Sequence, residues 1–194
     1  MQNHRGFTIV ELMITVAIAA ILVTVAVPAM RSFVQQGQVV SVANELSGAI
    51  TKIQDRAIGI GACMCPTTNA SVATPVCAAS SNWETGWIGF TDANSNCVID
   101  GADTLIKVWD GTSYAGQLTV RTVSPTINGS NRIFFNTFGE PRLANGSSQL
   151  GVFRVCDPRG LVGVTNSTTA VGVVLSASGS ARTTRNIAQI LACP

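Results

Sequence analysis

An apolar run near the start of the chain, residues 7–30, constrains its fold more than any other feature. The run has 24 residues, and apart from three threonines its only polar side chain is the carboxylate of Glu11. As a helix it would extend about 36 Å, enough to cross a hydrocarbon core about 30 Å thick. A carboxylate inside a bilayer is costly unless it is paired. Glu11 is therefore either paired with another group or an acid near the membrane interface whose side chain reaches water.

A secretory signal peptide is the competing interpretation of this run, because Arg5 precedes it as a positive charge. The run is longer than a typical signal core, starts six residues into the chain, and has no small-x-small cleavage pattern before a clear break. We therefore expect a membrane anchor. The positive-inside rule then places the N-terminus in the cytoplasm and the rest of the chain across the membrane.

A helical pattern continues through residues 31–58, after a bend expected at Pro28. Apolar residues recur there at spacings of three and four, which places them on one face of an amphipathic helix. They are Val39, Val42, Leu46, Ile50, Ile53 and Ala57. We predict one helix from about Phe7 to about Ile58, which would be about 78 Å long.

Beyond Gly61 the sequence predicts short strands separated by Gly, Asn, Ser and Pro. The runs have four to eight residues rich in β-branched or aromatic types, and they lie within residues 86–92, 104–110, 117–123, 132–139, 150–157 and 171–179. We expect antiparallel sheets that pack on the amphipathic part of the helix. The predicted fold class is α+β, with residues 59–194 forming one β-rich globular head together with residues 31–58.

The six cysteines all lie after the apolar run, in surroundings that suggest loops. They show no CxxC pairs, and the sole histidine is His4 in the N-terminal leader, so a zinc site is not indicated. An even number of cysteines favours disulfides and an oxidising compartment. The chain also lacks GxSxG, HExxH and phosphate-loop motifs, so we expect no enzymatic activity.

The segment "DANSNCVIDGAD" places oxygen-bearing side chains where a calcium loop of EF-hand type has its ligands. These are Asp92, Asn94, Asn96, Asp100 and Asp103. Cys97 stands where such a loop needs glycine, and strands are predicted on both sides in place of helices. An Asn/Asp-rich turn without metal accounts for the same residues. We expect no cofactor, with calcium as the alternative.

The N-terminal segment "GFTIVELMITVAIAAILVTVAVPAM" resembles the class III signal of type IV prepilins and of type II secretion pseudopilins. The rest of the chain resembles the GspH/FimT group of minor pilins and pseudopilins, including the FimU-like ones. The segments that carry this second resemblance are "ANELSGAITKIQDRAI", "WETGWIGFTDANSN", "FNTFGEPR", "VFRVCDPRG" and "VVLSASGSARTTRNIAQILACP". Together the two resemblances cover nearly the whole chain and imply a pilin-like fold.

The resemblance implies that residues 1–6 are a leader, which a prepilin peptidase removes after Gly6 before methylating the new N-terminus at Phe7. A glycine lets a protease approach the backbone closely. It further implies that Glu11 pairs with the Phe7 ammonium of a neighbouring subunit. The partners would be major and minor pilins, contacted through the N-terminal helix. The subunit would be stored in the bacterial inner membrane, with its head in the periplasm, before it enters an extracellular pilus.

The resemblance also implies a disulfide between Cys156 and Cys193, which would hold the end of the chain to the last strands. The other four cysteines, Cys63, Cys65, Cys77 and Cys97, then have three possible connectivities. A bond between Cys63 and Cys65 would be strained, so each is expected to pair with Cys77 or Cys97 in an order that the sequence leaves open.

The arginines of the second half suggest a further role, because residues 112–194 hold seven Arg and two acids. Relatives of the FimT type resemble DNA-uptake pilins, in which a C-terminal Gly-Arg-x-Arg motif contacts DNA. The corresponding segment here is "GSARTTR", with Ser180 at the first arginine position. Phosphate contacts could come from Arg182 and Arg185, joined by Arg159 and Arg142.

The sequence therefore favours a structural minor pilin that helps to prime the pilus. A DNA-binding subunit for natural transformation and a GspH-type pseudopilin of type II secretion are the alternatives.

Overall fold

The computed structural model describes residues 6–123, 127, 131–143, 145–161 and 168–193. Apart from Gly6, the expected leader lies outside these residues. Helix α1 (Ile9–Ala57) has 49 residues and contains Pro28, so the predicted long helix is confirmed with ends one or two residues inside the expected ones. The Thr8 hydroxyl accepts a hydrogen bond from the Glu11 backbone N–H at 3.2 Å, which caps the first turn. The helix ends before Gly59, whose φ of +89° favours glycine.

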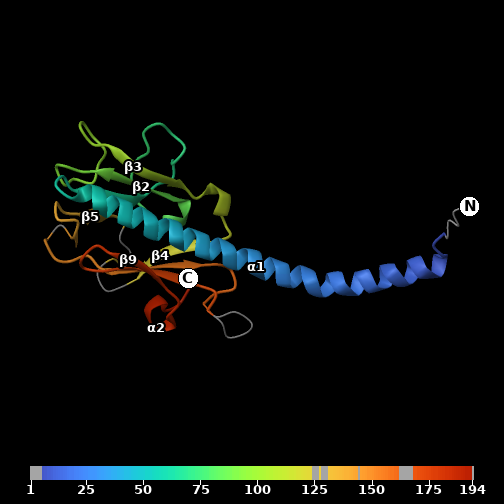
Figure 1. The fold of residues 1–194 in the computed structure, drawn as a ribbon. Helices are drawn as coiled ribbons and strands as arrows, with labels where there is room; N and C mark the ends of the chain where they lie inside the picture. Colours follow the sequence, from blue (N-terminus) through green and yellow to red (C-terminus); the bar gives the residue numbers. More distant parts are fainter. Residues whose placement is uncertain (1–5, 124–126, 128–130, 144, 162–167, 194) are drawn as a thin grey trace, which may run out of the picture. The chain divides into compact units, whose positions relative to one another are not determined.

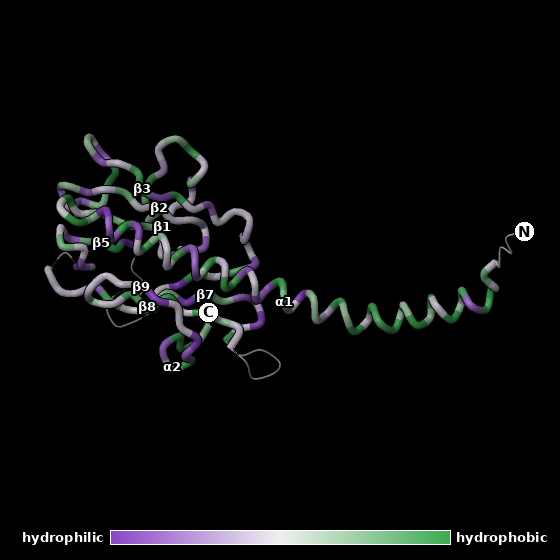
Figure 2. Tube along the Cα trace, viewed as in Figure 1, coloured by the Kyte–Doolittle hydropathy of each residue, from purple (hydrophilic) through white to green (hydrophobic). Residues whose placement is uncertain are grey.

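The chain forms two compact units, Met1–Gln38 and Val39–Pro194. In the first unit every residue from 6 to 34 is exposed, and Figure 2 shows how apolar this part of α1 is. Burial begins at Val39 and continues along the predicted apolar face of the helix. The buried residues of α1 are Val39, Val42, Ala43, Leu46, Ala49, Ile50, Ile53 and Ala57.

The second unit contains two antiparallel sheets (Figure 1). Sheet A has the order β3-β2-β1-β5-β6 and sheet B the order β4-β7-β8-β9. The strands of sheet A are β1 (Ala62–Pro66), β2 (Gly86–Thr91), β3 (Leu105–Asp110), β5 (Ile133–Phe135) and β6 (Pro141–Arg142). Those of sheet B are β4 (Thr119–Val123), β7 (Gly151–Cys156), β8 (Val171–Leu175) and β9 (Ala181–Thr184). Short helices η1 (Trp83–Thr85), η2 (Thr112–Tyr114) and α2 (Ile187–Ile190) complete the described elements.

The second half of α1 supplies the centre of the main hydrophobic core, which it forms with residues of both sheets. Leu46, Ile50 and Ile53 are fully buried there. Gly89 on β2 lies so close to the helix that an added Cβ would be 2.1 Å from Cδ1 of Ile53. Trp83 packs edge-on against Phe153 of β7 with ring centroids 5.0 Å apart. The expected α+β arrangement is therefore confirmed.

Three strands were not predicted from the sequence. β1 has the sequence ACMCP, lies at the centre of sheet A, and is buried along its whole length, whereas its cysteines suggested a loop. Cysteine is a small apolar residue that fits a buried strand, but this strand has no β-branched or aromatic residue to reveal it. β6 has two residues, and β9 carries Arg182 in an exposed edge position.

Candidate functional site

The N-terminal segment presents its candidate residues to the outside. Nothing lies within 4 Å of the position of a Cβ on Gly6, and the Phe7 side chain is 78% exposed. Glu11 follows in the first turn of α1, where a negative charge interacts favourably with the helix dipole. The Thr-x-x-Glu spacing of Thr8 and Glu11 is also a helix-start signal, which the sequence analysis did not use. The peptide bond after Gly6 and the Glu11 side chain are therefore both accessible.

The outer face of sheet A carries a second hydrophobic cluster, and two disulfides hold loops over it. Along β1, Ala62 and Met64 point to the main core, whereas Cys63 and Cys65 point to this cluster. Its buried members are Cys63, Cys65, Ile88, Phe90 and Cys97. The bonds are Cys63–Cys97 and Cys65–Cys77, which is one of the two arrangements that the sequence left open.

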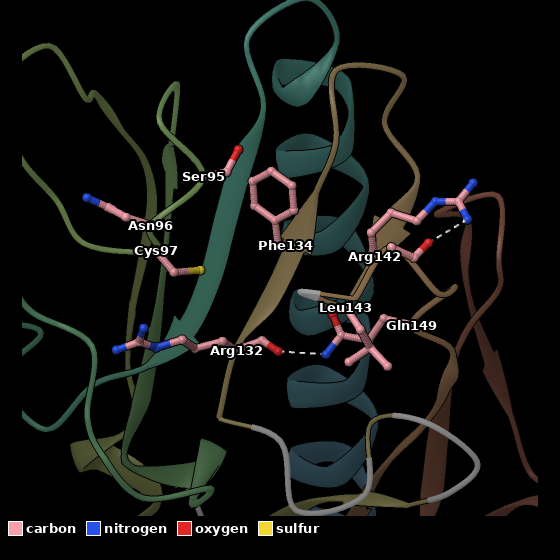
Figure 3. Close-up of a pocket in the computed structure, with 9 residues that line it drawn as sticks. Ser95, Asn96, Cys97, Arg132, Phe134, Arg142, Leu143 and Gln149 are labelled. Carbon is pink, nitrogen blue, oxygen red and sulfur yellow. Dashed lines mark hydrogen bonds between the residues drawn. The ribbon is translucent and has the colours of Figure 1, made fainter.

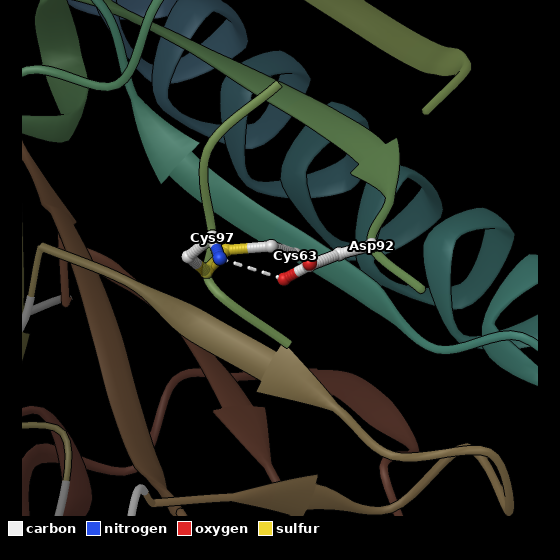
Figure 4. A group of neighbouring side chains, drawn as sticks. All are labelled: Cys63, Asp92 and Cys97. Atoms are coloured by element: carbon white, nitrogen blue, oxygen red, sulfur yellow. Dashed lines mark hydrogen bonds between the residues drawn. A yellow bond between two sulfur atoms is a disulfide. The ribbon is translucent and has the colours of Figure 1, made fainter. Parts of the chain in front are cut away.

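Asp92 follows β2 and is fully buried beside the Cys63–Cys97 disulfide (Figure 4). Its carboxylate accepts hydrogen bonds from the backbone N–H groups of Asn96 at 3.1 Å and Cys97 at 2.8 Å. The ligand atoms of Asp92, Cys63 and Cys97 all lie within 4.8 Å of one another. The two sulfurs are bonded to each other, so they cannot serve as thiolate ligands for a metal.

The five candidate calcium ligands form a turn that satisfies its own polar groups. Asn94 and Asn96 direct their amide N–H groups, not their oxygens, at Asp100, at 3.2 and 2.8 Å. The Asn96 oxygen accepts the Val98 N–H, and Asp103 accepts the Asp100 N–H. Calcium requires convergent oxygen ligands. In the structure these oxygens accept hydrogen bonds within the loop, and the Asn94 and Asn96 amides would have to turn for their oxygens to face a calcium ion.

A cavity of about 540 Å³ lies on the same face of sheet A, beyond the end of the second cluster (Figure 3). Phe134, which pairs with Cys63 across β5 and β1, lies between Ser95 on one side and Leu143 on the other. The Gln149 amide donates to the Arg132 carbonyl at 2.7 Å, and Arg142 donates to Glu140. The cavity therefore combines an aromatic side chain, Phe134, with two arginines in its lining.

The end of the chain is fixed to sheet B. Cys156 on β7 is bonded to Cys193, the pairing that the family resemblance implied. Asn186 caps α2 by accepting the Ala188 N–H at 2.9 Å, and Ile190 is buried against Cys156 and Ala170. This arrangement holds β9 and the arginines near it in place, although β9 is an edge strand.

The four candidate arginines differ in their surroundings. Arg142, on β6 of sheet A, donates to Glu140 at 2.6 Å, and this bond lowers the pKa of the Glu140 carboxyl. Arg159 forms an ion pair with the buried Asp157. Arg182 lies on the exposed edge strand β9, and its guanidinium has no hydrogen bond or ion pair with the described part of the chain. Arg185 donates only a long bond, 3.4 Å, to the Thr168 carbonyl. Arg182 and Arg185 are therefore the pair with available guanidinium groups.

Sheet B contains a second arginine pair that the sequence analysis did not single out. Arg121 on β4 and Arg154 on β7 are direct cross-strand partners. The pKa of Arg154 is lowered, first by burial of its guanidinium and second by repulsion from the positive charge of Arg121. Glu84 of η1 forms an ion pair with Arg121 and accepts the Val120 N–H at 3.2 Å. Register across a sheet, which a single sequence does not give, would have been needed to find this group.

Two families match the chain. The family described as "Prokaryotic N-terminal methylation motif" matches residues 1–27, and that described as "Type II transport protein GspH" matches residues 42–179. The second match covers more than half of the chain, so the chain belongs to the GspH family. This is a family of structural pilins and pseudopilins. The methylation motif and the exposed apolar helix fit a membrane-anchored pilin that is assembled into a pilus.

The chain is also similar to two curated proteins of Moraxella bovis. It is 31% identical to a type IV major alpha-pilin over 96 residues, which cover 50% of this chain and 53% of the relative. It is 38% identical to fimbrial protein Q over 53 residues, 27% of this chain and 34% of the relative. The chain thus spans about half or less of the length of these relatives. No solved structure matches significantly.

Proposed function

We propose that this protein is a minor type IV pilin, a structural subunit that is incorporated into the pilus and helps to prime its assembly. The observation that carries the proposal is the combination of two units in one chain. Residues 6–34 form an exposed, apolar helical segment with one acid, and the rest is a self-contained head with three disulfides. An apolar surface of this extent needs other apolar surfaces to cover it.

Glu11 gives this assembly its register. Cleavage after Gly6 would leave a positively charged amine on Phe7, four residues before Glu11. In a filament the amine of one subunit would pair with the Glu11 carboxylate of its neighbour, which offsets the cost of placing either charge among apolar helices. The membrane would then be a store, from which the subunit leaves when a filament offers this partner.

Processing can be tested directly by expressing the chain with and without a prepilin peptidase. Mass spectrometry of the purified chain should show the loss of residues 1–6 and one added methyl group on Phe7, only when the peptidase is present. A Gly6→Val variant should stay uncleaved, because its side chain obstructs the approach of the protease to the backbone. Filaments that contain the chain with residues 1–6 intact would contradict the proposal.

A DNA-binding role in natural transformation is the second candidate, and the availability of Arg182 and Arg185 favours it. Neither guanidinium is neutralised by a carboxylate in the described residues, whereas Arg142 and Arg159 both are. The Cys156–Cys193 bond holds this tail to the sheet, so the two charges are presented on a fixed edge. Contacts to phosphates would make the affinity fall steeply with salt.

An electrophoretic shift assay with duplex DNA at low salt tests this second role. An Arg182→Ala/Arg185→Ala variant should lose most of the binding, whereas an Arg159→Ala variant should retain it. The role would be rejected if the unaltered protein gave no shift at low salt.

A pseudopilin of type II secretion is the alternative within the same family, because the name of the GspH family refers to type II transport. Deletion of the gene separates the two. A pilin predicts lost or fewer surface pili with normal protein secretion, and a pseudopilin predicts the reverse.

A further inference from the structure

A cavity of about 240 Å³ lies between the second half of α1 and strand β9, within the second unit. We call it the Arg185 cavity. Its lining residues are Val40, Asn44, Val171, Thr183, Thr184 and Arg185. At about 30 Å³ for each water molecule, it has room for a small polyatomic ion together with several waters. Its residues come from α1 and, far along the sequence, from β8, β9 and the residue after β9, so no local motif reveals it.

The polar side chains of the Arg185 cavity are all able to donate hydrogen bonds, and most of this capacity is unused. The Asn44 amide and the Thr183 hydroxyl are exposed and form no hydrogen bond with the described residues. The Thr184 side chain lies on the opposite face of β9, beside Gly172, and its oxygen accepts the Asn186 N–H at 3.1 Å, so Thr184 lines the cavity without donating into it. The Arg185 guanidinium donates one N–H to the Thr168 carbonyl at 3.4 Å, and its four other N–H groups are available to a ligand.

The charge of the Arg185 cavity is positive, because it has one guanidinium and none of its six lining residues is acidic. The nearest acid along α1, Glu45, is held at 2.5 Å by Lys107 of β3 in sheet A. A cation would find one amide oxygen, one hydroxyl and a repelling guanidinium here. An oxyanion would instead accept bonds from Arg185, Thr183 and Asn44, and bonds to a charged acceptor are the strong ones.

We propose that the Arg185 cavity binds a phosphate group, either as free phosphate or as one phosphodiester of a nucleic acid. Arg185 supplies the charge, and Asn44 and Thr183 fix the position of the oxygens. The site is separate from Arg182, whose neighbour in register on β8 is Val174. The free-phosphate form does not depend on any role in transformation, whereas the phosphodiester form rests on the DNA-binding role above.

The site can be tested by titrating the full chain in detergent micelles with inorganic phosphate at constant ionic strength, against chloride. NMR would follow the side-chain amide of Asn44 and the Nε–H of Arg185. Both signals should shift in a saturable manner. Arg185→Gln should weaken phosphate binding at least tenfold, and the near-isosteric Thr183→Val should weaken it several-fold. All of these residues are at the surface or in open contact with the cavity, so the head should stay folded.

Arg182→Gln is the matched control, because it removes the same charge three residues earlier in the chain, at a position that does not line the cavity. This variant should bind phosphate as the unaltered chain does. The proposal would be overturned if phosphate caused no saturable shift, or if Arg182→Gln weakened binding as much as Arg185→Gln, which would indicate general electrostatic attraction.

A short DNA duplex then identifies the source of the phosphate group. If the Asn44 signal shifts with the duplex and free phosphate displaces it, the cavity takes a phosphodiester. If the duplex leaves Asn44 unchanged in a chain that binds inorganic phosphate, the cavity takes the free ion. Asn44→Ala should weaken binding of whichever ligand is correct.

Discussion

Leu22 and Leu46 belong to the same helix, yet the first side chain is 63% exposed and the second is fully buried. Leu46 packs in the main core with residues of both sheets. Leu22 lies in the unit Met1–Gln38, in which residues 6–34 are all exposed. One continuous helix thus serves two purposes. Its second half folds the head, and its first half has apolar side chains whose partners must come from outside the chain.

The difference shows where each half obtains its stability. In the second half, helix formation is driven by the packing of one amphipathic face, as is usual in globular proteins. The first half has apolar residues on every side, which is typical of a helix surrounded by lipid or by other helices. Mutations in the two halves should therefore affect different properties.

The largest contrast is expected from the same substitution in the two halves. Leu46→Ala should lower the free energy of unfolding of the head by about 2–5 kcal/mol, because it leaves a cavity in the core. Leu22→Ala should change it by less than about 0.5 kcal/mol. Denaturation of the full chain in micelles, followed by the fluorescence of Trp83 and Trp87, measures both, because these tryptophans are buried in the head. Equal effects of the two variants would contradict the conclusion that only the second half of α1 stabilises the head.

Removal of the Cys156–Cys193 bond should have the next largest effect, and only on the head. A Cys156→Ala/Cys193→Ala variant removes a cross-link between residues that are 37 positions apart in the sequence. This should lower the free energy of unfolding by about 2–4 kcal/mol. Amide exchange should accelerate at α2 and β9 and stay unchanged at β1. An unchanged unfolding midpoint would show that the tail is held by its packing alone.

A smaller effect is expected from the ion pair at the edge of sheet B. Glu84→Gln leaves the cations of Arg121 and Arg154 side by side with no counter-charge from Glu84. It should destabilise the head by about 1–2 kcal/mol, since Glu84 and Arg121 are both largely buried. Glu45→Gln, in the more exposed pair with Lys107, is the control and should cost less than about 1 kcal/mol. A larger loss from the Glu45 variant would contradict this ranking.

The smallest effect concerns the pH dependence of the head. The pKa of Glu140 is lowered mainly by the hydrogen bond that Arg142 donates to its carboxylate, and second by the hydrogen bond from Asn136. A carboxyl whose pKa is lower in the folded state stabilises above its ordinary pKa of about 4.3, and this stabilisation is lost as the pH falls through the folded value. Glu140→Gln should therefore lower the Tm at pH 7 and make no difference in strong acid. A difference that stays constant with pH would contradict the role of this charge.

The parts of the fold that could be predicted are those with a local periodic signal. The recurrence of Val42, Leu46 and Ile50 identified the buried face of α1, whereas the assembly role of Glu11 stays a prediction. β1 could not be predicted, because Cys63 and Cys65 obtain their strand conformation from neighbours on both sides in sheet A. The Arg185 cavity could not be predicted either, because Asn44 and Thr183 are distant in the sequence. Only the tertiary structure brings them together.

The most direct test of the account is the fate of a Glu11→Ala subunit in cells that make pili. Immunoblots would compare the amount of the variant in the inner membrane with the amount in sheared filaments, with Thr15→Ala as a control in the same exposed segment. We expect membrane levels like those of the unaltered chain, and at least a tenfold loss from filaments that Thr15→Ala does not show. Normal incorporation of Glu11→Ala would contradict the claim that this segment is an assembly interface.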